Sequence, residues 1–415
     1  MKNFHRKMEI FYKRRILKNK DKLTMTNGRI CVVLVIDDLE YGGAQRQVIE
    51  LANNMDIDRF DVHVCTLSDY VPLGSQLKDS RSRLHTVVKK NKVDFTVVPR
   101  MARLLKLLKA DVVHSYLFAS DIASRLAGRL AGTRVVIGSE RNANYSPKKR
   151  NILAYRLTRR YVDLTIANSE TGARFNSKMY GQPACDYRVV RNGVDTELFK
   201  PRDRISIRNE LGISADNSVI GVFASFKPQK NHSLLFHAFK MVLTSCPDAQ
   251  LLLVGGRLYG NMMGSGDYYG RMNDLIDELG IRQRCIFLGN RNDVEQIYSA
   301  CDITVLPSLY EGTPNALLES MACGIPVVAT RVCDNSFIVK EDQTGFLVEL
   351  DNVRKMADRI QVLLDNDVLR REMGQNAREW MLEEFTLEEL AKKTEAVYME
   401  ALSQKTENAD KKRKG

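Results

Sequence analysis

Two patterns of apolar and polar positions alternate along this chain. Short apolar runs of strand length are followed by stretches in which apolar residues recur every three or four positions, as in amphipathic helices. In the first half the pattern predicts strands at 29–37, 62–67, 112–114, 134–138, 164–167 and 188–195, and helices at 44–55 and 102–108. Alternation of this kind is typical of a parallel sheet with helices on both faces.

The second half repeats the plan. Strands are predicted at 218–224, 250–254, 285–288, 303–306 and 327–329, and helices at 232–243, 357–364, 369–384 and from there to about residue 403. We therefore expect an α/β protein with two doubly wound, Rossmann-like parallel-sheet domains that face each other across a cleft. Ligands of such sheets bind at the carboxyl ends of the strands.

The pattern divides the chain into four parts. We expect residues 26–200 to form the first Rossmann-like domain and residues 201–403 the second, whose last helix can pack back on the first domain. Residues 404–415 are polar and basic, and we expect them to be disordered. Residues 1–25 hold nine Lys and Arg against two acidic residues. A membrane-bound segment, a disordered leader and a mere choice of start site all stay open for them.

Size and composition favour a soluble protein with two full cores. The chain has 415 residues, 44% hydrophobic and 27% charged, which is ordinary for globular proteins. No apolar run is long enough to span a bilayer, and residues 1–22 lack the apolar core of a signal peptide. The eight cysteines form no C-x-x-C pair, which favours free thiols in a reducing compartment. We expect a cytoplasmic protein, with peripheral attachment to the inner face of the plasma membrane as an open alternative.

Charge is distributed unevenly between the halves. Residues 1–200 hold 37 basic and 20 acidic residues, a net charge of +17, and the rest holds 26 basic and 31 acidic residues, a net charge of −5. A basic half indicates an anionic partner surface. The sequence shows no nucleic-acid-binding motif of the usual kinds, so a membrane or a lipid-phosphate acceptor is the better interpretation.

Two segments of the basic half combine cations with an apolar stripe. The first runs over residues 100–109 and the second over residues 148–160. Both patterns fit a helix that lies on a membrane, and both also fit a core-packed helix with solvated charges.

The stretch from Glu311 to Glu319 carries the strongest chemical signal. It follows the predicted strand 303–306 and leads into a helix, for which Thr313 is the expected N-cap and Pro314 the first residue. A carboxylate accepts two hydrogen bonds at once and can clamp the vicinal diol of a ribose or hexose. The alternative is a helix with an exposed glutamate on each side.

The start of that helix offers a phosphate site. Its first amides point out of the helix, and unpaired N–H groups at the positive end of the dipole bind anions such as a diphosphate. The amides expected there belong to Asn315, Ala316 and Leu317.

Three weaker signals fall at the same edge of the predicted sheets. Gly42 and Gly43 open a helix after the first strand and permit close approach of a phosphate or sugar. Lys230 opens the first helix of the second half and can hold a phosphate as a point charge. His114 ends a predicted strand. For the glycines an ordinary tight turn is an equal alternative, and for the other two a solvated lysine and a packed histidine are the commoner structural roles.

The motifs together resemble the retaining glycosyltransferases of family 4, which have the GT-B fold. They run in the family's order: YGGAQR at 41–46, DVVH at 111–114, IANSE at 166–170, NGVD at 192–195, PQKNH at 228–232, FLG at 287–289, LPS at 306–308, and the Glu311/Glu319 pair with MACGIPVV at 321–328. The resemblance implies transfer of a sugar from a nucleotide-sugar to an acceptor, with the anomeric configuration retained.

The resemblance also implies that residues 26–200 form the acceptor-side domain and residues 201–403 the nucleotide-sugar-binding domain, and it assigns roles to residues of the second. It implies that Glu311 contacts hydroxyls of the donor sugar and that Glu319 holds the nucleotide ribose. Lys230 and the amides after Pro314 would neutralise the diphosphate leaving group. Breaking the anomeric bond places negative charge on that diphosphate, and fixed positive groups stabilise it.

In the first half the resemblance places Gly42 and Gly43 against donor and acceptor, and His114 near the sugar. One departure concerns the diphosphate. Members of the family commonly have an arginine where this chain has Ser225, and we expect Lys227 to supply that charge.

We expect no metal and no other cofactor. Asp56 and Asp58 spell an aspartate-x-aspartate tripeptide, but the pattern places it in a turn at the opposite edge of the sheet. No G-x-G-x-x-G follows either first strand, which disfavours a nicotinamide enzyme.

The leading hypothesis is therefore a metal-independent transferase of hexosyl or N-acetylhexosaminyl groups. It would take a UDP-sugar and act on a polysaccharide or lipid-linked acceptor, with no nucleic-acid partner. A nucleotide-sugar epimerase or phosphorylase on the same fold, and a non-catalytic sugar-binding subunit, stay open. The sequence leaves the sugar, the base, the acceptor and the oligomeric state undetermined.

Overall fold

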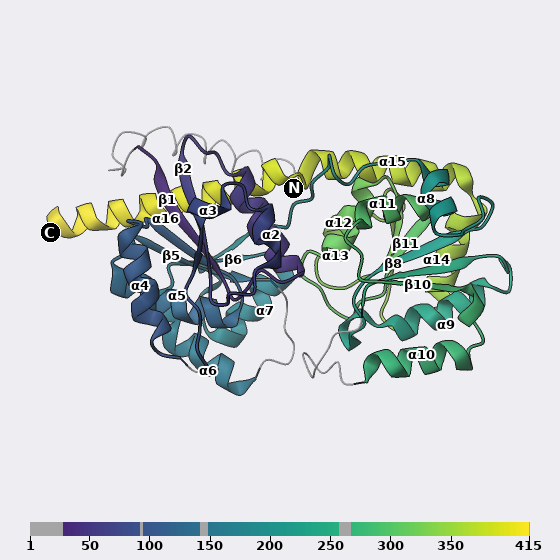
Figure 1. Cartoon of the computed structure of the whole chain (residues 1–415), viewed down its shortest axis with the longest axis horizontal. Coiled ribbons are helices and arrows are strands. Elements are labelled where there is room, and N and C mark those ends of the chain that lie inside the picture. The colour runs from purple at the N-terminus through teal and green to yellow at the C-terminus, as the bar shows by residue number, and fades with distance from the viewer. Residues whose placement is uncertain (1–27, 92–93, 142–147, 257–266, 415) are drawn as a thin grey trace. The chain divides into compact units, whose positions relative to one another are not determined.

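A computed structural model describes residues 28–91, 94–141, 148–256 and 267–414 (Figure 1). The chain forms two compact units. Unit 1 takes in residues 1–168, 173–190 and 390–415, and unit 2 takes in 169–172 and 191–389. The main crossing from unit 1 to unit 2 thus lies at residue 190 rather than near 200, and the chain returns to unit 1 at residue 390. Residues 1–25 lie outside the described residues.

Unit 1 is built on a seven-stranded parallel sheet of order β3-β2-β1-β4-β5-β6-β7. Its strands are β1 Ile30–Ile36, β2 Phe60–Thr66, β3 Leu84–Thr86, β4 Val112–Ser115, β5 Val135–Glu140, β6 Leu164–Ala167 and β7 Tyr187–Val189. Its helices are α2 Gly43–Asn54, α3 Ser80–Arg83, α4 Val97–Leu107, α5 Phe118–Ala131, α6 Lys149–Thr158, most of α7 Glu170–Tyr180 and most of α16 Leu387–Lys414. All seven residues of β1 are buried, as expected of a parallel strand covered on both faces.

Unit 2 is built on a six-stranded parallel sheet of order β10-β9-β8-β11-β12-β13. Its strands are β8 Val219–Phe223, β9 Gln250–Val254, β10 Cys285–Gly289, β11 Ile303–Leu306, β12 Val327–Thr330 and β13 Gly345–Val348. Its helices are α8 Arg204–Glu210, α9 His232–Val242, α10 Tyr268–Glu278, α11 Val294–Ile297, α12 Asn315–Ala322, α13 Asn335–Ile338, α14 Val353–Asp365 and α15 Asp367–Glu384.

Alternate residues of one strand feed two cores in unit 2. In β9, Leu251 and Leu253 belong to a cluster with Phe239 of α9 and Ile360 of α14. The intervening Leu252 belongs to a second cluster, which includes residues of α12 and α15. Successive side chains of a strand point to opposite faces, so this sheet is covered by helices on both sides.

Both sheets reverse their strand order beside the first strand. β1 pairs with β2 on one side and with β4 on the other, and β8 pairs with β9 and β11 in the same way. Such a switch point separates the loops of neighbouring strands at their carboxyl ends and leaves room for a ligand there. Each unit therefore has one place where its fold favours binding.

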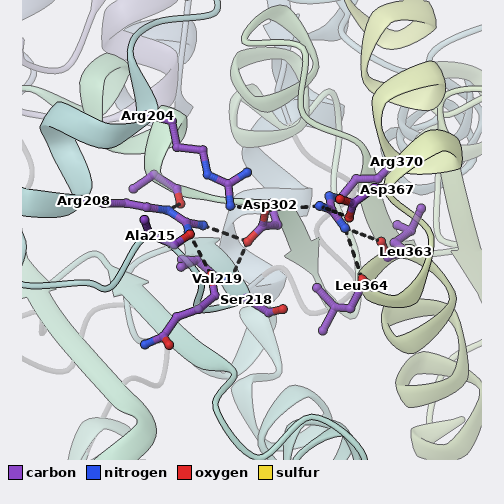
Figure 2. Close-up of polar contacts among 12 residues, drawn as sticks. Arg204, Arg208, Ala215, Ser218, Val219, Asp302, Leu363, Leu364, Asp367 and Arg370 are labelled. Atoms are coloured by element: carbon purple, nitrogen blue, oxygen red, sulfur yellow. Dashed lines mark hydrogen bonds and ion pairs between the residues drawn. The ribbon is translucent and has the colours of Figure 1, made fainter.

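A cluster of ionic contacts around the buried Asp302 lies at the amino ends of β8 and β11 in unit 2 (Figure 2). The carboxylate of Asp302 accepts hydrogen bonds from Arg208 at 2.8 Å and from the amide of Val219 at 2.7 Å. Arg204 of α8 lies 2.7 Å away, and Arg370 of α15 lies at 3.8 Å. A buried charge is tolerated only when it is paired and hydrogen-bonded. Asp302 meets that condition and ties two helices to the sheet.

The last helix differs from the sequence expectation. α16 continues to Lys414, where the sequence pattern predicts a disordered tail from residue 404. The reason is that the helix keeps contacts with unit 1: Leu402 is fully buried, and Lys405 lies 2.5 Å from the carboxylate of Asp163. A polar composition alone did not reveal these contacts. In the part of the chain that the structure describes, no helix is long and apolar enough to cross a bilayer.

Candidate active site

Lys230 and Glu311 meet at the switch point of unit 2. Lys230 ends a short turn after β8, and Glu311 follows β11, the neighbouring strand. The Lys230 ammonium lies 2.5 Å from a carboxylate oxygen of Glu311, and the two side chains are only 14% and 9% exposed. The fold thus joins two predicted site residues that are 81 positions apart.

Backbone contacts hold these two loops in register. The amide of Leu309 donates to the carbonyl of Gln229 at 2.8 Å, and the Gln229 side chain donates to the carbonyl of Tyr310 at 2.7 Å. Asn231, directly after Lys230, adopts a left-handed φ of 47° and is the N-cap of α9. Asparagine is among the residues that tolerate this conformation. The position of Lys230 is therefore set by the surrounding backbone.

Lys227 belongs to the same group of charges. Its pKa is lowered, first by burial and then by the nearby positive charge of Lys230, while the negative charge of Glu311 opposes the shift. The two ammonium groups of Lys227 and Lys230 thus lie close enough to repel each other, and the carboxylate of Glu311 offsets part of this repulsion. Lys227 thus lies near Lys230 and Glu311, and its role in place of an arginine at Ser225 stays a prediction.

The loop after β9 approaches these residues closely, and the sequence reading missed it. A Cβ atom on Gly255 would lie 2.2 Å from the carbonyl oxygen of Ala224 and 2.9 Å from the amide nitrogen of Ser225. The amide of Phe226 also donates to the carbonyl of Gly256 at 3.2 Å. A Gly-Gly pair directly after an apolar run was the available signal for this contact.

The helix after Glu311 begins one residue later than predicted. Pro314, not Thr313, is the N-cap of α12; its backbone is extended, and no side chain caps the helix. The reason lies outside the helix: the side chain of Asn192 donates to the carbonyl of Thr313 at 2.8 Å and to the side chain of Asn315 at 2.7 Å. Asn192, from the NGVD segment, therefore fixes where α12 starts.

The amides at this helix start are not equivalent. The Leu317 amide donates to the carbonyl of Pro314 at 3.1 Å, so one of the three predicted phosphate-binding amides already has an acceptor. The amides of Asn315 and Ala316 belong to the first turn, which has no intrahelical acceptor. The anion-binding capacity of the helix therefore rests on these two.

Glu319 is buried and oriented by a residue that the sequence analysis did not single out. The hydroxyl of Tyr298 donates to a carboxylate oxygen of Glu319 at 2.9 Å. Burial and the charge of Glu319 raise the pKa of Tyr298 well above its usual value. The Tyr298 ring stacks on Phe223 of β8, with centroids 3.6 Å apart. No local pattern marks a tyrosine for this role.

Gly42 and Gly43 lie at the switch point of unit 1. Gly42 is the N-cap of α2 with φ −152°, and Gly43 is the first helical residue. Gly42 therefore needs no special backbone conformation. A Cβ atom there would lie 2.4 Å from the side chain of Gln45, which in turn donates to Asp38 at 2.9 Å. A glycine at position 42 therefore leaves space for the Gln45 side chain, and it is not required by a positive φ.

His114 lies on β4 beside β1 and is fully enclosed. Its Nδ1 atom lies 2.6 Å from the hydroxyl of Tyr398, and its Nε2 atom lies 2.6 Å from the hydroxyl of Ser139. Burial, followed by the charge of Arg141, lowers the pKa of His114 to about 3. The ring is therefore neutral, and both nitrogens have partners within unit 1. Its predicted contact with the sugar stays a prediction.

A further, partly buried carboxylate links the two loops of this switch point. Asp37 follows β1, and its carboxylate accepts a hydrogen bond from the Ser120 amide of α5 at 2.7 Å. Burial raises the pKa of Asp37. Leu117 precedes α5 with φ 67°, which is strained for a residue other than glycine. The sequence analysis missed both residues.

The aspartate pair considered for metal forms a turn. The amide of Asp58 donates to the side chain of Asp56 at 3.0 Å, and both residues are exposed. A side chain that accepts from the backbone two residues on is typical of a turn. The expected assignment of Asp56 and Asp58 to a turn is confirmed.

Known structures share this two-unit fold. The Anabaena protein HepE, solved in complex with UDP-glucose, superimposes with a TM-score of 0.78 over 91% of this chain and all of its own, at 22% identity. A glycosyltransferase from Rickettsia africae superimposes with a TM-score of 0.77 at 20% identity, over 90% of this chain and 99% of its own.

Curated relatives match most of the chain. An Escherichia coli protein named UDP-Gal:alpha-D-GlcNAc-diphosphoundecaprenol alpha-1,3-galactosyltransferase is 27% identical over 88% of this chain and 95% of its own length. The Bacillus anthracis N-acetyl-alpha-D-glucosaminyl L-malate synthase is 27% identical over 74% of this chain and 80% of its own length.

Two family models cover both units in turn. Residues 41–198 match Glycosyltransferase Family 4, and residues 203–380 match Glycosyl transferases group 1. The order of these two matches agrees with the order of the two sheets and with the motifs that carry the Lys230 and Glu311 site. The chain belongs to the family 4 glycosyltransferases and has their GT-B fold.

Proposed function

We propose that this glycosyltransferase moves a hexosyl or N-acetylhexosaminyl group from a UDP-sugar to a lipid-linked or polysaccharide acceptor, with retention of configuration. The observation that carries the proposal is the group formed by Lys227, Lys230 and Glu311 at the switch point of unit 2. The name of the E. coli relative supports a UDP-sugar donor and a diphospholipid acceptor, and the UDP-glucose complex of HepE supports the same donor class.

The leaving diphosphate is the centre of the proposed chemistry. As the anomeric bond breaks, negative charge develops on the phosphate oxygens. Lys230, Lys227 and the amides of Asn315 and Ala316 would stabilise this charge, because they are held in place before the reaction begins. These groups belong to the chain itself, so we propose that transfer needs no metal ion.

The two glutamates would divide the remaining contacts. Glu319, oriented by Tyr298, would accept hydrogen bonds from the ribose hydroxyls of the nucleotide. Glu311 would accept hydrogen bonds from the transferred sugar while it keeps Lys230 in place. In unit 1, the roles of Gly42 and Gly43 toward donor and acceptor stay predictions. A neutral His114 would act through hydrogen bonds rather than charge.

A transfer assay tests the proposal. The purified protein is incubated with UDP-glucose, UDP-galactose or the UDP-N-acetylhexosamines and a diphospholipid-linked N-acetylglucosamine, with EDTA present. We expect a glycosylated lipid with an α-linkage by NMR, and UDP released only when acceptor is present. Interconversion of UDP-sugars without acceptor would instead identify an epimerase. Loss of activity in EDTA that manganese restores would overturn the metal-independent mechanism.

A further inference from the structure

The solvent-facing side of α6 in unit 1 is unusual. Tyr155 and Thr158 turn inward and are buried. What we call the α6 face consists of the exposed Lys149, Arg150, Leu153, Arg156 and Leu157 of α6, with the exposed Arg159 and Arg160 of the short 3-10 helix that follows. Leu153 is 58% exposed and Leu157 is 66% exposed. Two large apolar side chains thus project into solvent from the middle of a cationic surface.

The charge of this face is not balanced by its own segment. No aspartate or glutamate occurs from residue 141 to residue 162. Arg156 donates to the carbonyl of Met179 at 3.0 Å, and Arg159 donates to the carbonyl of Gly181 at 2.8 Å. Carbonyl acceptors hold the guanidinium groups in position without neutralising them, so the face keeps its positive charge.

The α4 segment, which the sequence pattern made an equal candidate, is different. Its apolar stripe lies in the core, where Met101 and Leu105 are buried. Arg100 is paired with Asp94 at 2.9 Å. One leucine at its end, Leu107, is exposed. The structure therefore separates two segments that look alike in sequence.

We propose that the α6 face is a docking surface for an anionic lipid membrane. Leu153 and Leu157 enter the boundary between headgroups and acyl chains, and the surrounding cations contact lipid phosphates. Apolar anchors within a cationic rim distinguish this surface from one for nucleic acid, which uses aromatic stacking or groove contacts. A second copy of the same face would be repelled by its charge. The inference rests on the proposed function in one respect: a lipid-linked acceptor is presented at such a membrane.

Vesicle sedimentation with the full-length chain tests the proposal. The probes are vesicles of equal parts phosphatidylglycerol and phosphatidylcholine, and vesicles of phosphatidylcholine alone. The unchanged protein should sediment with the anionic vesicles only and dissociate as sodium chloride rises, since salt screens the attraction. Equal binding to neutral vesicles, or no binding to anionic vesicles at low salt, would overturn the proposal.

Two matched triple variants locate the surface. K149Q/R150Q/L153S removes two cations and one exposed leucine from α6, and R103Q/K106Q/L107S removes the same from α4. At roughly fivefold for each charge near an anionic surface, the α6 variant should partition at least about 25-fold more weakly, and the α4 variant should behave like the unchanged protein. The reverse result, or equal loss in both, would overturn the assignment to α6.

A further pair of measurements separates this inference from the proposed function. L153S/L157S keeps every charge, and it should bind anionic vesicles at low salt more weakly than the unchanged protein, because the two leucines no longer enter the lipid boundary. UDP should still raise the Tm of all three variants, because the residues proposed to hold UDP lie in unit 2. If UDP fails to stabilise even the unchanged protein while vesicle binding follows the pattern above, the proposed donor is wrong and the docking surface stands. Competition by RNA at equal phosphate concentration would point to a general polyanion surface and overturn the membrane assignment.

Discussion

The contact between Lys230 and Glu311 gives one carboxylate two tasks. Glu311 holds the Lys230 ammonium, and in the proposed reaction this ammonium faces the diphosphate while Glu311 also contacts the sugar. Removing one partner of a buried ion pair leaves an uncompensated charge and destabilises the protein by about 3–5 kcal/mol. Alanine at this position would therefore combine a folding effect with a catalytic one, and a more conservative change is needed to separate them.

Glu311→Gln keeps the size of the side chain and its capacity to accept a hydrogen bond. We expect turnover to fall by about 10²-fold, as for other lost transition-state contacts, while UDP affinity is kept or rises because Lys230 no longer faces a negative charge. Steady-state kinetics and calorimetric titration with UDP measure the two effects. A loss of UDP affinity equal to the loss of turnover would show that Glu311 acts through Lys230 alone.

Glu319 is predicted to recognise the ribose, and the nucleotide itself provides the control. The unchanged protein should bind UDP more tightly than 2′-deoxy-UDP, because Glu319 accepts from the ribose hydroxyls. Glu319→Ala should bind both nucleotides equally and weakly. Tyr298→Phe removes the hydrogen bond at 2.9 Å that orients Glu319, and it should cost about 0.5–1.5 kcal/mol of UDP affinity. Continued discrimination by Glu319→Ala would exclude the ribose contact.

At the scale of elements, short apolar runs were the reliable signal for the positions of buried strands. β6, β9 and β11 begin and end where the apolar pattern places them, because a strand covered on both faces must be apolar throughout. The short β13 was missed, since four residues beginning with a glycine carry little pattern.

Contacts between distant residues account for the other differences. The start of α12 was misplaced because Asn192, far away in sequence, fixes the carbonyl of Thr313. The hydrogen bond between His114 and Tyr398 spans 284 positions, and no local pattern predicts it. The sequence therefore located the loops that carry the site, whereas the partners that orient each side chain came only from the tertiary structure.

The end of β5 gives unit 1 a pH-dependent stability. Glu140 is buried beside the ion pair of Asp121 and Arg125, and it accepts a hydrogen bond from Asn176 at 3.1 Å. Burial, then the charge of Asp121, raises its pKa to about 8, while Arg125 opposes the shift. Between the ordinary value near 4.5 and about 8, the folded protein therefore holds a proton that the unfolded chain releases.

Stability should consequently fall as pH rises through that window, by up to about 1.4 kcal/mol per pH unit for this one group. Glu140→Gln cannot ionise and should show a flatter dependence, with a higher Tm than the unchanged protein at pH 8.5. Thermal unfolding from pH 5 to pH 9 measures the difference. Parallel curves for the two proteins would mean that Glu140 is ionised in the folded state.

On the scale of the whole molecule, the last helix completes the unit that the chain begins. Tyr398 of α16 is fully buried and bonded to His114, and Arg188 lies 2.5 Å from Glu400. A protein that ends at residue 389 should therefore lose several kcal/mol of unit 1 stability, since burying one large side chain contributes about 1.5–3 kcal/mol. A protein that ends at residue 406 keeps these contacts and should unfold near the normal Tm. Equal unfolding curves would show that α16 contributes nothing to unit 1.

The return of α16 also sets an order of events during synthesis. The ribosome makes the strands of unit 1 first, but Tyr398 emerges only after all of unit 2 has been translated. Until then His114 lacks its hydrogen bond to Tyr398. The sheet of unit 2 does not depend on a later segment in this way, because all of its strands are translated before α16 begins. We therefore expect the half of the protein that is translated first to finish folding last.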